Sequence, residues 1–517
     1  MIGFERKRNF YDFMNTSLIG VQGELDSRQT ERLRRITEAW NFYEGYHWEE
    51  LPDQDTPELT VNYCRAFVDK FVSFELGKSF SITTHKNMEG IPVTPEGRTI
   101  SEYLESVWED NDRSMFATEL GQMKSITGDS WVQVRYFTSE ELSDPFGEYP
   151  QGRLKLLLMP TSVVFPEYDP HQRGVLTRLT IMYSYERISR TSILGRQRKE
   201  EVLFKQVWTA EECATYDGTK EPVIVPNRYK TIPFVQIKNL PIAGRNEGRG
   251  DLEDIIPLNT ELNMKESNVS EIIDYHAAPV TIVYGAKVGN LEKGANKMWG
   301  GLSKEARVEN LELKGDLGAS SNYISSLKLS MCEVGGIPET VLGGAQAISN
   351  TSGVALEYIN LPLVEKTRIK RMSTKAGLEA LNKLILLVSS MEGLIQKPPL
   401  EDVSTRDFFW NEVSIPDTLP KDKLLELQQI QQEMKMGLES RRGAMKRVGK
   451  ENIEDLIKEI DKDMKENPCL YGHIDPNDPR HMPQEQQLNS GMTNGETPVE
   501  QVRRETTGQN GTPEQQP

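Results

Sequence analysis

Residues 251–278 have the sequence DLEDIIPLNTELNMKESNVSEIIDYHAA, and the pattern of this stretch decides what kind of fold the chain can have. Its apolar residues recur at spacings of three and four, which predicts an amphipathic helix with Asn, Glu, Ser and Lys on its outer faces. A helix of about 25 residues is roughly 38 Å long. Pro257 conflicts with this prediction only if the helix begins before it, because proline lacks the amide hydrogen that a helix interior needs. The apolar residues that fit the spacing are Leu252, Ile255, Ile256, Leu262, Val269, Ile272 and Ile273.

A short β-rich insertion follows this helix. Residues 279–287 (PVTIVYGAK) and 307–313 (RVENLEL) have the composition of strands, and a Gly- and Lys-rich segment separates them. A second helix is predicted at 320–334. We therefore expect two stalk helices with the β segment at their tip, and a closed ring of equivalent stalks would bury their apolar sides. The apolar residues that repeat in the second helix are Ile324, Leu327, Met331 and Val334.

A nearly uncharged segment interrupts the helices next. Residues 335–356 (GGIPETVLGGAQAISNTSGVAL) carry no charge except Glu339. A long helical stretch at 352–394 follows, and Pro362 inside it should produce a kink. The composition of the segment predicts flexibility, and this leaves two interpretations: a functional loop or a surface hinge.

The part of the chain before residue 251 predicts an α+β body. Helices are expected at 28–46, 59–77 and 100–127. The Gly-rich stretch 244–250 closes the body, and we interpret it as a flexible joint rather than a phosphate cradle, because it lacks the GxGxxG spacing and a Lys-Ser/Thr pair. Short segments rich in β-branched and aromatic residues are predicted as strands. They are SWVQVRYF, GRLKLLLM, LTRLTIMYSY, EVLFKQVW and PFVQIKN.

The C-terminal part predicts a strand, more helix and then a disordered tail. Residues 406–413 (RDFFWNEV) resemble a strand, and residues 420–465 have a helical pattern. From about residue 475 the chain consists of Pro, Gln, Asn, Gly, Thr and Glu with almost no apolar residues, which predicts disorder.

Composition excludes several classes of protein. The chain has 517 residues with 61 Lys and Arg against 78 Asp and Glu, and a net charge of −17 argues against tight binding of nucleic acid. No apolar run approaches the roughly 20 residues of a membrane helix, and the first 20 residues lack the apolar core of a signal peptide. The cysteines have no CxxC spacing, so we expect reduced thiols. They are Cys64, Cys213, Cys332 and Cys469.

No motif in the sequence indicates catalysis, a cofactor or a metal. The chain lacks GxxxxGK[ST], HExxH and GxSxG. The acidic residues at 461–463 and 475–478 are interpreted as solvated charges rather than a cation site, and the basic run 441–450 as a solvated helix face rather than a phosphate or partner contact. The histidines have no metal-ligand spacing. They are His47, His85, His171, His276, His473 and His481.

Several stretches in consistent order resemble the portal proteins of tailed bacteriophages, in the group similar to the siphophage SPP1 portal. The strongest is 233–286, which runs from PFVQIKN through the first predicted stalk helix to VTIVYGA. The others are AWNFYEGYHW (39–48), VNYCRAFVDKFVSFELGKSFSI (61–82), GDSWVQVRYF (128–137), LMPTSVVFPEYD (158–169) and SNTSGVALEYINLPLVEKTRIKRM (349–372).

The resemblance implies a helix-rich α+β fold, an elongated portal subunit with wing, stem, clip and crown parts, and a ring of twelve copies around a DNA channel at one capsid vertex. The parts map onto this sequence as an N-terminal arm (1–28), a wing (29–250), a first stem helix (251–278), a clip (279–317), a second stem helix (318–336), a channel loop (337–353), a long kinked helix returning to the wing (354–415), a crown (416–466) and a disordered tail (467–517).

The resemblance also implies partners and sites, without catalysis. The partners are further copies of the chain, double-stranded DNA that passes without sequence specificity, terminase, major capsid and scaffold proteins, and head-completion or connector proteins. The implied site is a virion vertex, built from protein made in the host cytoplasm. Lys328 is the candidate channel-facing stem residue, and Met298 and Trp299 are candidate clip contacts. The candidate DNA-channel loop residues are Gly343, Gly344, Gln346, Ser349, Asn350 and Thr351.

Two other classes of protein stay open at this point. One is a minor capsid or other oligomeric virion protein without a DNA channel. The other is an enzyme that acts on nucleic acid, although the sequence carries no metal or phosphate motif for it.

Overall fold

The computed structural model describes residues 25–48, 59–142, 147, 149–190, 197–219, 221–277, 281–284, 307–310, 317–343, 353–398, 404–416, 423–448 and 453–466. The fold is helix-rich α+β, as the sequence predicts. Two compact units, Met1–Leu419 and Pro420–Pro517, divide the chain, and each is described by itself.

The N-terminal body contains helices where the sequence predicts them, and the structure defines where each helix begins and ends. Helix α2 (Ser27–Glu44) begins at a capping box formed by Asp26 and Gln29, and α3 (Tyr63–Leu76) begins four residues later than the periodicity suggested. The helical stretch 100–127 consists of two helices, α4 (Ile100–Asp110) and α5 (Arg113–Thr127). They separate at Asp112, whose backbone is left-handed.

A three-stranded antiparallel sheet forms the centre of this body. Its order is β3–β2–β9, with β2 at Asp129–Phe137, β3 at Arg153–Met159 and β9 at Phe234–Lys238. Helices α4, α5 and α9 cover it, and the long α9 (Gly353–Met391) contacts β9 directly. The core between them is large and apolar; its fully buried members include Phe80, Leu104, Trp108, Leu120, Val132, Ile237 and Ile385.

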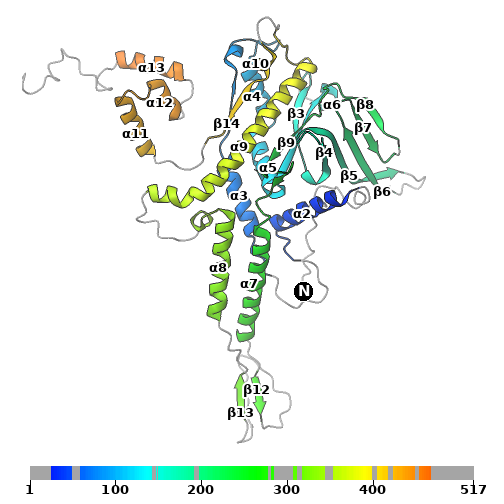
Figure 1. The fold of residues 1–517 in the computed structure, drawn as a ribbon, viewed down its shortest axis with the longest axis vertical. Coiled ribbons are helices and arrows are strands. Elements are labelled where there is room, and N and C mark those ends of the chain that lie inside the picture. The colour runs from blue at the N-terminus through cyan, green and yellow to red at the C-terminus, as the bar shows by residue number, and fades with distance from the viewer. Residues whose placement is uncertain are drawn as a thin grey trace, which may run out of the picture. The chain divides into compact units, whose positions relative to one another are not determined.

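A second, five-stranded sheet is an antiparallel meander in sequence order (Figure 1). One face packs against α2 through Leu33, and the other covers Trp131 and Phe234. The strands are β4 (Val164–Tyr168), β5 (Leu176–Arg190), β6 (Gln197–Trp208), β7 (Glu212–Asp217) and β8 (Val223–Pro226). The sequence predicted β5 and β6 but not β4, β7 and β8, because these three are short and carry Pro, Ala or charged residues.

The predicted order of helix, two strands and helix is confirmed. Helices α7 (Ile255–Ala277) and α8 (Leu317–Gly335) pack side by side, and β12 (Thr281–Tyr284) pairs with β13 (Arg307–Asn310) in antiparallel register. Figure 1 shows the helix pair below the body. Pro257 is tolerated because it lies in the first turn of α7, where amide hydrogens have no partner within the helix.

Helix α9 contains Pro362, and its ribbon changes direction in the first half of the helix (Figure 1), as the sequence predicts. The strand expected at 406–413 is only partly correct. Residues Thr405–Phe409 form the short helix α10, because Ser404 caps its first turn by accepting a hydrogen bond from the Asp407 amide. The strand begins only at β14 (Asn411–Ser414), which pairs with β1 (Ser81–Thr84).

The Gly-rich joint at 244–250 is packed at its C-terminal end rather than free. Strand β11 (Gly248–Arg249) pairs with β10 (Leu240–Pro241). A Cβ atom at Gly248 would lie 2.2 Å from the carbonyl oxygen of Gly128, so glycine is needed for this close approach of two backbones. The remaining short elements of the body are the helix α6 (Ser139–Leu142) and the 3-10 turns η2 (Lys86–Met88) and η3 (Thr161–Val163).

The described residues of the second unit form three helices, which confirms the helical pattern predicted for 420–465. They are α11 (Lys423–Lys435), α12 (Arg441–Arg447) and α13 (Ile453–Glu466). Arg447 pairs with Glu433, and Arg441 lies 2.6 Å from Asp461. Two residues of the basic run and one residue of the acidic run 461–463 therefore make ion pairs within this unit. The tail predicted to be disordered, 467–517, lies outside the described residues.

Candidate functional site

The helix pair α7–α8 is the part of the fold on which the predicted site rests. Ile324, Leu327 and Met331 of α8 are buried, and α7 contributes Leu262 to the same apolar cluster. Lys328 Nζ lies 3.0 Å from Glu266 Oε1 across the pair. The charge of the predicted channel-facing lysine is therefore balanced by a carboxylate of its own chain.

One face of α7 carries a ladder of buried polar side chains, where the sequence analysis expected such residues on outer faces. Oxygens of Ser267, Asn263 and Asn259 accept hydrogen bonds from the amides of Leu59, Val61 and Tyr63, at 3.0, 3.0 and 3.1 Å. The three donors are two residues apart in an extended segment, a rise of about 6.6 Å, and the three acceptors are four residues apart on the helix, a rise of about 6 Å. Because these two distances are similar, each acceptor lies opposite its donor.

Asn259, the first of these three side chains along α7, also caps helix α3. Asn259 is fully buried, and its Oδ1 accepts from the Tyr63 and Cys64 amides while its Nδ2 donates to the Val61 carbonyl at 2.8 Å. The first amides of a helix have no partner within it. Asn259 of α7 thus completes the N-terminus of a helix that lies almost 200 residues earlier in the chain.

His47 extends the ladder and has a defined tautomer. Its Nε2 lies 2.9 Å from the Phe42 carbonyl, which can only accept, and its Nδ1 lies 2.6 Å from Asn263 Nδ2. Nε2 therefore carries the proton and Nδ1 accepts from Asn263. Burial lowers the pKa of His47, while the bond to Phe42 opposes this shift. The neutral imidazole therefore uses both of its ring nitrogens in hydrogen bonds.

A buried cluster of charges lies at the beginning of α7. We call it the basal charge cluster; its members are Glu75 of α3, Lys124 of α5, Asp251 before α7, and Lys366 and Lys370 of α9. The ammonium of Lys370 lies 2.6 Å from Asp251 and 3.5 Å from Glu75, and Lys124 lies 2.5 Å from Glu75. Four of the five side chains, all but that of Lys366, are fully buried.

The cluster shifts the pKa values of its members in opposite directions. Burial alone would raise the pKa of Asp251, but Lys370 and Lys366 outweigh burial and lower it to about 2. The same competition, with Lys124 and Lys370 as the cations, lowers the pKa of Glu75. Burial lowers the pKa of Lys124 to about 8 against the attraction of Glu75. Both carboxyl groups are therefore ionised at neutral pH.

Lys366 connects this cluster to the end of α8. Its Nζ lies 3.2 Å from Asp251 Oδ1 and donates to the Gly335 carbonyl at 2.9 Å. It also lies over the Phe71 ring, 4.1 Å from the centroid. At Gly335, a Cβ atom would lie 2.1 Å from the Phe67 ring, so α8 can approach α3 this closely only with glycine there. The start of α7, the end of α8 and helix α9 therefore meet at one point.

The first residues of the predicted loop are anchored to this junction. Ile337 is fully buried, and Val341 and Leu342 pack against the same core from the 3-10 turn η4 (Glu339–Leu342). Gly343 follows in the left-handed conformation at φ +99°. The predicted loop residues Gly344, Gln346, Ser349, Asn350 and Thr351 lie outside the described residues, as do Met298 and Trp299.

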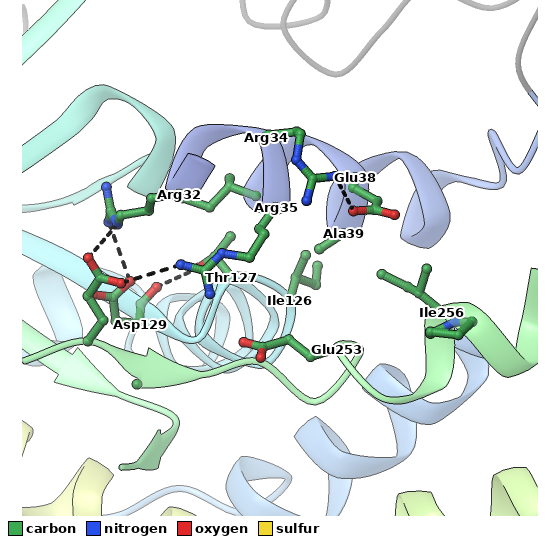
Figure 2. A pocket seen from close by; sticks show the side chains of 14 residues that line it. Arg32, Arg34, Arg35, Glu38, Ala39, Ile126, Thr127, Asp129, Glu253 and Ile256 are labelled. Carbon is green, nitrogen blue, oxygen red and sulfur yellow. Dashed lines mark hydrogen bonds and ion pairs between the residues drawn. The ribbon is translucent and has the colours of Figure 1, made fainter. Parts of the chain in front are cut away.

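A cavity of about 270 Å³ lies between α2, the end of α5 and the start of α7 (Figure 2). Arg32 lies 3.4 Å from Glu247 and 3.6 Å from Asp129, and Arg34 pairs with Glu38 along α2. Glu253 adds a further carboxylate to the lining. Because its carboxylates are at least as numerous as its guanidinium groups, the cavity does not have the positive excess of a phosphate site.

The described residues offer no metal centre and no membrane helix. In the ranges that the structure covers, no group of three or more His, Cys, Asp and Glu side chains is arranged to hold a metal ion. None of the helices in those ranges combines the length and apolar character that membrane crossing requires. Cys64, Cys213 and Cys332 are buried free thiols, as expected, and Cys469 lies outside the described residues.

The sequence analysis missed the basal charge cluster, although one signal of it was present. Lys370 lies in line with Leu363, Thr367 and Thr374 on α9, and all four are buried. A lysine inside an otherwise uncharged buried stripe requires an acidic partner. Its partners, Glu75 and Asp251, come from distant parts of the chain, and no local pattern identifies them.

A comparison with protein families confirms the resemblance seen in the sequence. A family model described as phage portal protein, SPP1 Gp6-like, matches residues 22–467. No curated protein matches the chain. A chain in the virion of a native gene transfer agent (GTA) particle has 11% identity and a TM-score of 0.35, and one in the neck of an empty GTA particle, computed with C6 symmetry, has 12% and 0.42. Each comparison covers 75% of this chain and 89% of the other.

Proposed function

The chain belongs to the SPP1 Gp6-like family of phage portal proteins, and from that premise we propose that twelve copies of it form a ring at one capsid vertex and that DNA is packaged and ejected through this ring. The observation that carries the proposal is the family match over residues 22–467, which includes every described element. As a phage portal protein, the chain is a structural component of a virion.

Exposed apolar side chains on the stem helices and on α9 support assembly into a ring. The exposed apolar residues of α9 share one face of the helix, and an apolar face of this kind indicates an interface. A closed ring of identical copies would bury the same faces on every subunit. The exposed residues are Met264 and Ile273 of α7, Tyr323, Leu329 and Val334 of α8, and Tyr358, Leu361, Ile369 and Met372 of α9.

The proposed parts follow the elements of the fold. The body that contains both sheets would be the wing (29–250), α7 and α8 the stem (251–278 and 318–336), and the β12–β13 pair part of the clip (279–317). The long α9 and the β14 strand would return the chain to the wing (354–415), and the second unit would be the crown (416–466).

The channel loop at 337–353 would contact moving DNA without holding it. Its candidate contacts, Gly343, Gly344, Gln346, Ser349, Asn350 and Thr351, are uncharged, whereas lysines would bind phosphates and slow the strand. Lys328 would reduce the repulsion of the acidic stem only in part, because Glu266 pairs with it.

The clip would bind the terminase motor during packaging and the connector proteins afterwards. Met298 and Trp299 are its proposed contacts, because Met and aromatic residues are enriched at protein interfaces. We propose no catalytic activity for this chain: hydrolysis of ATP would belong to the terminase. Major capsid and scaffold proteins are further proposed partners.

Electron microscopy of the purified full-length chain tests the proposal, with class averages sorted by symmetry. We expect rings close to twelvefold symmetry with a pore wide enough for duplex DNA. Small closed oligomers without a pore, at protein concentrations where portal rings assemble, would contradict the proposal and favour a minor structural protein of the virion.

A further inference from the structure

The three lysines of the basal charge cluster face only two carboxylates. Glu75 lies 2.5 Å from Lys124. Asp251 lies 2.6 Å from Lys370, so each carboxylate already has one lysine at hydrogen-bond distance. These four side chains are fully buried. Lys366 is therefore the surplus cation of the cluster, and a buried charge without a carboxylate of its own is costly to keep away from water.

Lys366 is also the member of the cluster that reaches the surface. Its side chain keeps 20% of its surface accessible, whereas the other four side chains keep none. A lysine can move its ammonium into water by rotating its own methylene stem. When Lys366 does so, Asp251 keeps Lys370 at 2.6 Å and the side-chain amide of Asn239 at 3.1 Å. The departure of this lysine therefore leaves neither buried carboxylate without a partner.

The contact that Lys366 would give up is the one with the end of α8, which lies directly below α9 (Figure 1). Its Nζ donates to the Gly335 carbonyl at 2.9 Å. The helix ends in a Schellman motif, in which the Gly336 and Ile337 amides bond back to carbonyls of the last turn at 3.3 and 3.1 Å. The last carbonyls of a helix have no partner within it, so Lys366 supplies from α9 the partner that Gly335 lacks in α8.

The stem of Lys366 covers the point at which the chain leaves α8. Gly336 has a φ of +71°, a left-handed conformation that favours glycine. A Cβ atom at Gly336 would lie 3.6 Å from Cδ of Lys366 and 4.0 Å from the carbonyl oxygen of Pro362, at the bend of α9. The predicted loop begins at the next residue, Ile337. The position of Lys366 therefore decides whether this glycine turn is held against α9.

We propose that Lys366 is a releasable latch that positions the start of the loop. When its ammonium is bound to the Gly335 carbonyl, the latch holds the last turn of α8 against α9. When its ammonium turns into water, the last turn of α8 and the glycine turn are free to move, while the other four charges of the cluster stay paired. Only the role of the loop in a channel rests on the proposed function; the latch does not.

Lys370 provides a matched comparison one helical turn further along α9. Both ammonium groups pair with Asp251, and both lie over the Phe71 ring, at 4.1 Å for Lys366 and 4.7 Å for Lys370. Lys370, however, is fully buried and donates to Ser125 and Asp251 rather than to the end of α8. Removing Lys370 should therefore weaken the cluster, whereas removing Lys366 should release the end of α8.

Hydrogen exchange of the full-length chain tests the latch in the variant Lys366→Met. We expect the Gly336 and Ile337 amides to exchange about tenfold faster than in the natural chain, because the last turn of α8 opens locally. The Asp251 amide, which bonds to a carbonyl of α5 at 2.7 Å, should keep its protection. Lys366→Arg keeps the charge and the donors and should restore the slow exchange.

The comparison with Lys370→Met distinguishes a latch from a purely structural lysine. Lys370→Met should lower the urea midpoint of the whole chain, because it leaves a buried carboxylate without its closest partner. Lys366→Met should lower that midpoint much less. Unchanged exchange at Gly336 and Ile337 in Lys366→Met overturns the proposal, and so does a loss of overall stability as large as that of Lys370→Met.

A test on the natural chain needs no substitution. An amine-reactive acetylating reagent at low conversion, read out by mass spectrometry, reports which lysines reach water in the folded chain. We expect Lys366 to be acetylated at least about tenfold faster than Lys124 and Lys370, which meet the reagent only when the chain unfolds, and more slowly than the exposed Lys383 of α9. Acetylation of Lys366 no faster than that of Lys370 would show that the latch does not open. Neither measurement depends on a ring or on DNA, so failure of the latch and failure of the proposed function are distinguishable.

Discussion

Asp251 shows how a single buried charge can hold several elements together. Asp251 lies just before α7 and forms ion pairs with Lys370 and Lys366 of α9. Removing one partner from a buried ion pair is much more destabilising than the pair itself is stabilising, because the remaining charge has no compensation. In this cluster the loss of the Asp251 charge would leave three lysines with Glu75 as the only carboxylate.

We predict that Asp251→Asn lowers the free energy of unfolding by about 3–5 kcal/mol at pH 7. The pKa of Asp251 in the folded chain, about 2, lies below its ordinary value of 3.8, so its stabilisation is present above pH 3.8 and is lost as the pH falls toward 2. The gap between the natural chain and the variant should therefore narrow over that pH range. Urea unfolding at several pH values measures it.

Glu253→Gln is the matched control for Asp251→Asn. Glu253 lies two residues away and is more than one-third exposed, and its Oε1 accepts from the Gly250 amide, a contact that Gln can keep. The loss of its charge should change stability by less than about 1 kcal/mol. An Asp251→Asn effect as small as this control would mean that the basal charge cluster contributes little.

At the scale of an element, α7 is a polar template as well as an apolar stem helix. Its ladder of Asn259, Asn263 and Ser267 orients the extended residues 59–63, and these in turn begin α3. Because α3 supplies Phe67 and Phe71 to the core and Glu75 to the basal charge cluster, the ladder couples the start of the stem to the body.

We predict that Asn259→Ala destabilises the chain by about 1–3 kcal/mol, because the buried Cys64 amide loses its partner and the Tyr63 amide and the Val61 carbonyl keep only their bond to each other. Thermal unfolding checks the size of the loss, and hydrogen exchange should locate it at the first turn of α3. Asn268→Ala serves as the control, since Asn268 is an exposed asparagine of the same helix. Equal effects of the two substitutions would exclude the capping role.

At the scale of the whole molecule, the proposed channel depends on the contrast between an acidic chain and an uncharged loop. The net charge of −17 repels DNA, and salt limits this repulsion to roughly 10 Å. The loop candidates add no cation that would hold the phosphates. DNA would then pass freely, because its contacts with the loops of the surrounding subunits would all be weak.

Introducing lysine at Gln346, Ser349 and Asn350 should leave ring assembly unchanged and slow DNA packaging about tenfold at low salt, with recovery as salt rises, because each lysine adds a phosphate contact. A packaging assay with purified terminase and capsids provides the rate. The neutral control Gln346→Asn/Ser349→Thr/Asn350→Gln should package normally. Normal packaging by the lysine variant at low salt would show that the loop does not contact DNA in the channel.

The sequence by itself determined the elements whose periodicity is local. The apolar spacing of 251–278 and 320–334 predicted α7 and α8, the β-branched and aromatic residues of two segments predicted β5 and β6, and Pro362 predicted the bend of α9. It also determined the family, because the ordered stretches lie along most of the chain. The sequence did not predict short strands such as β7 or the one-turn helix α10, because these elements are too short to show a repeating pattern of apolar residues.

Only the tertiary structure decided which polar residues are buried and what they contact. Asn259 and Lys370 look like surface residues in the sequence, yet both are fully buried. Asn259 lies 196 residues from its partner Tyr63, and Lys370 lies 119 residues from Asp251 and 245 from Ser125. Helical and strand periods report only neighbours along the chain, so contacts of this range, and the junction they build at the base of α7, arise only when the chain folds.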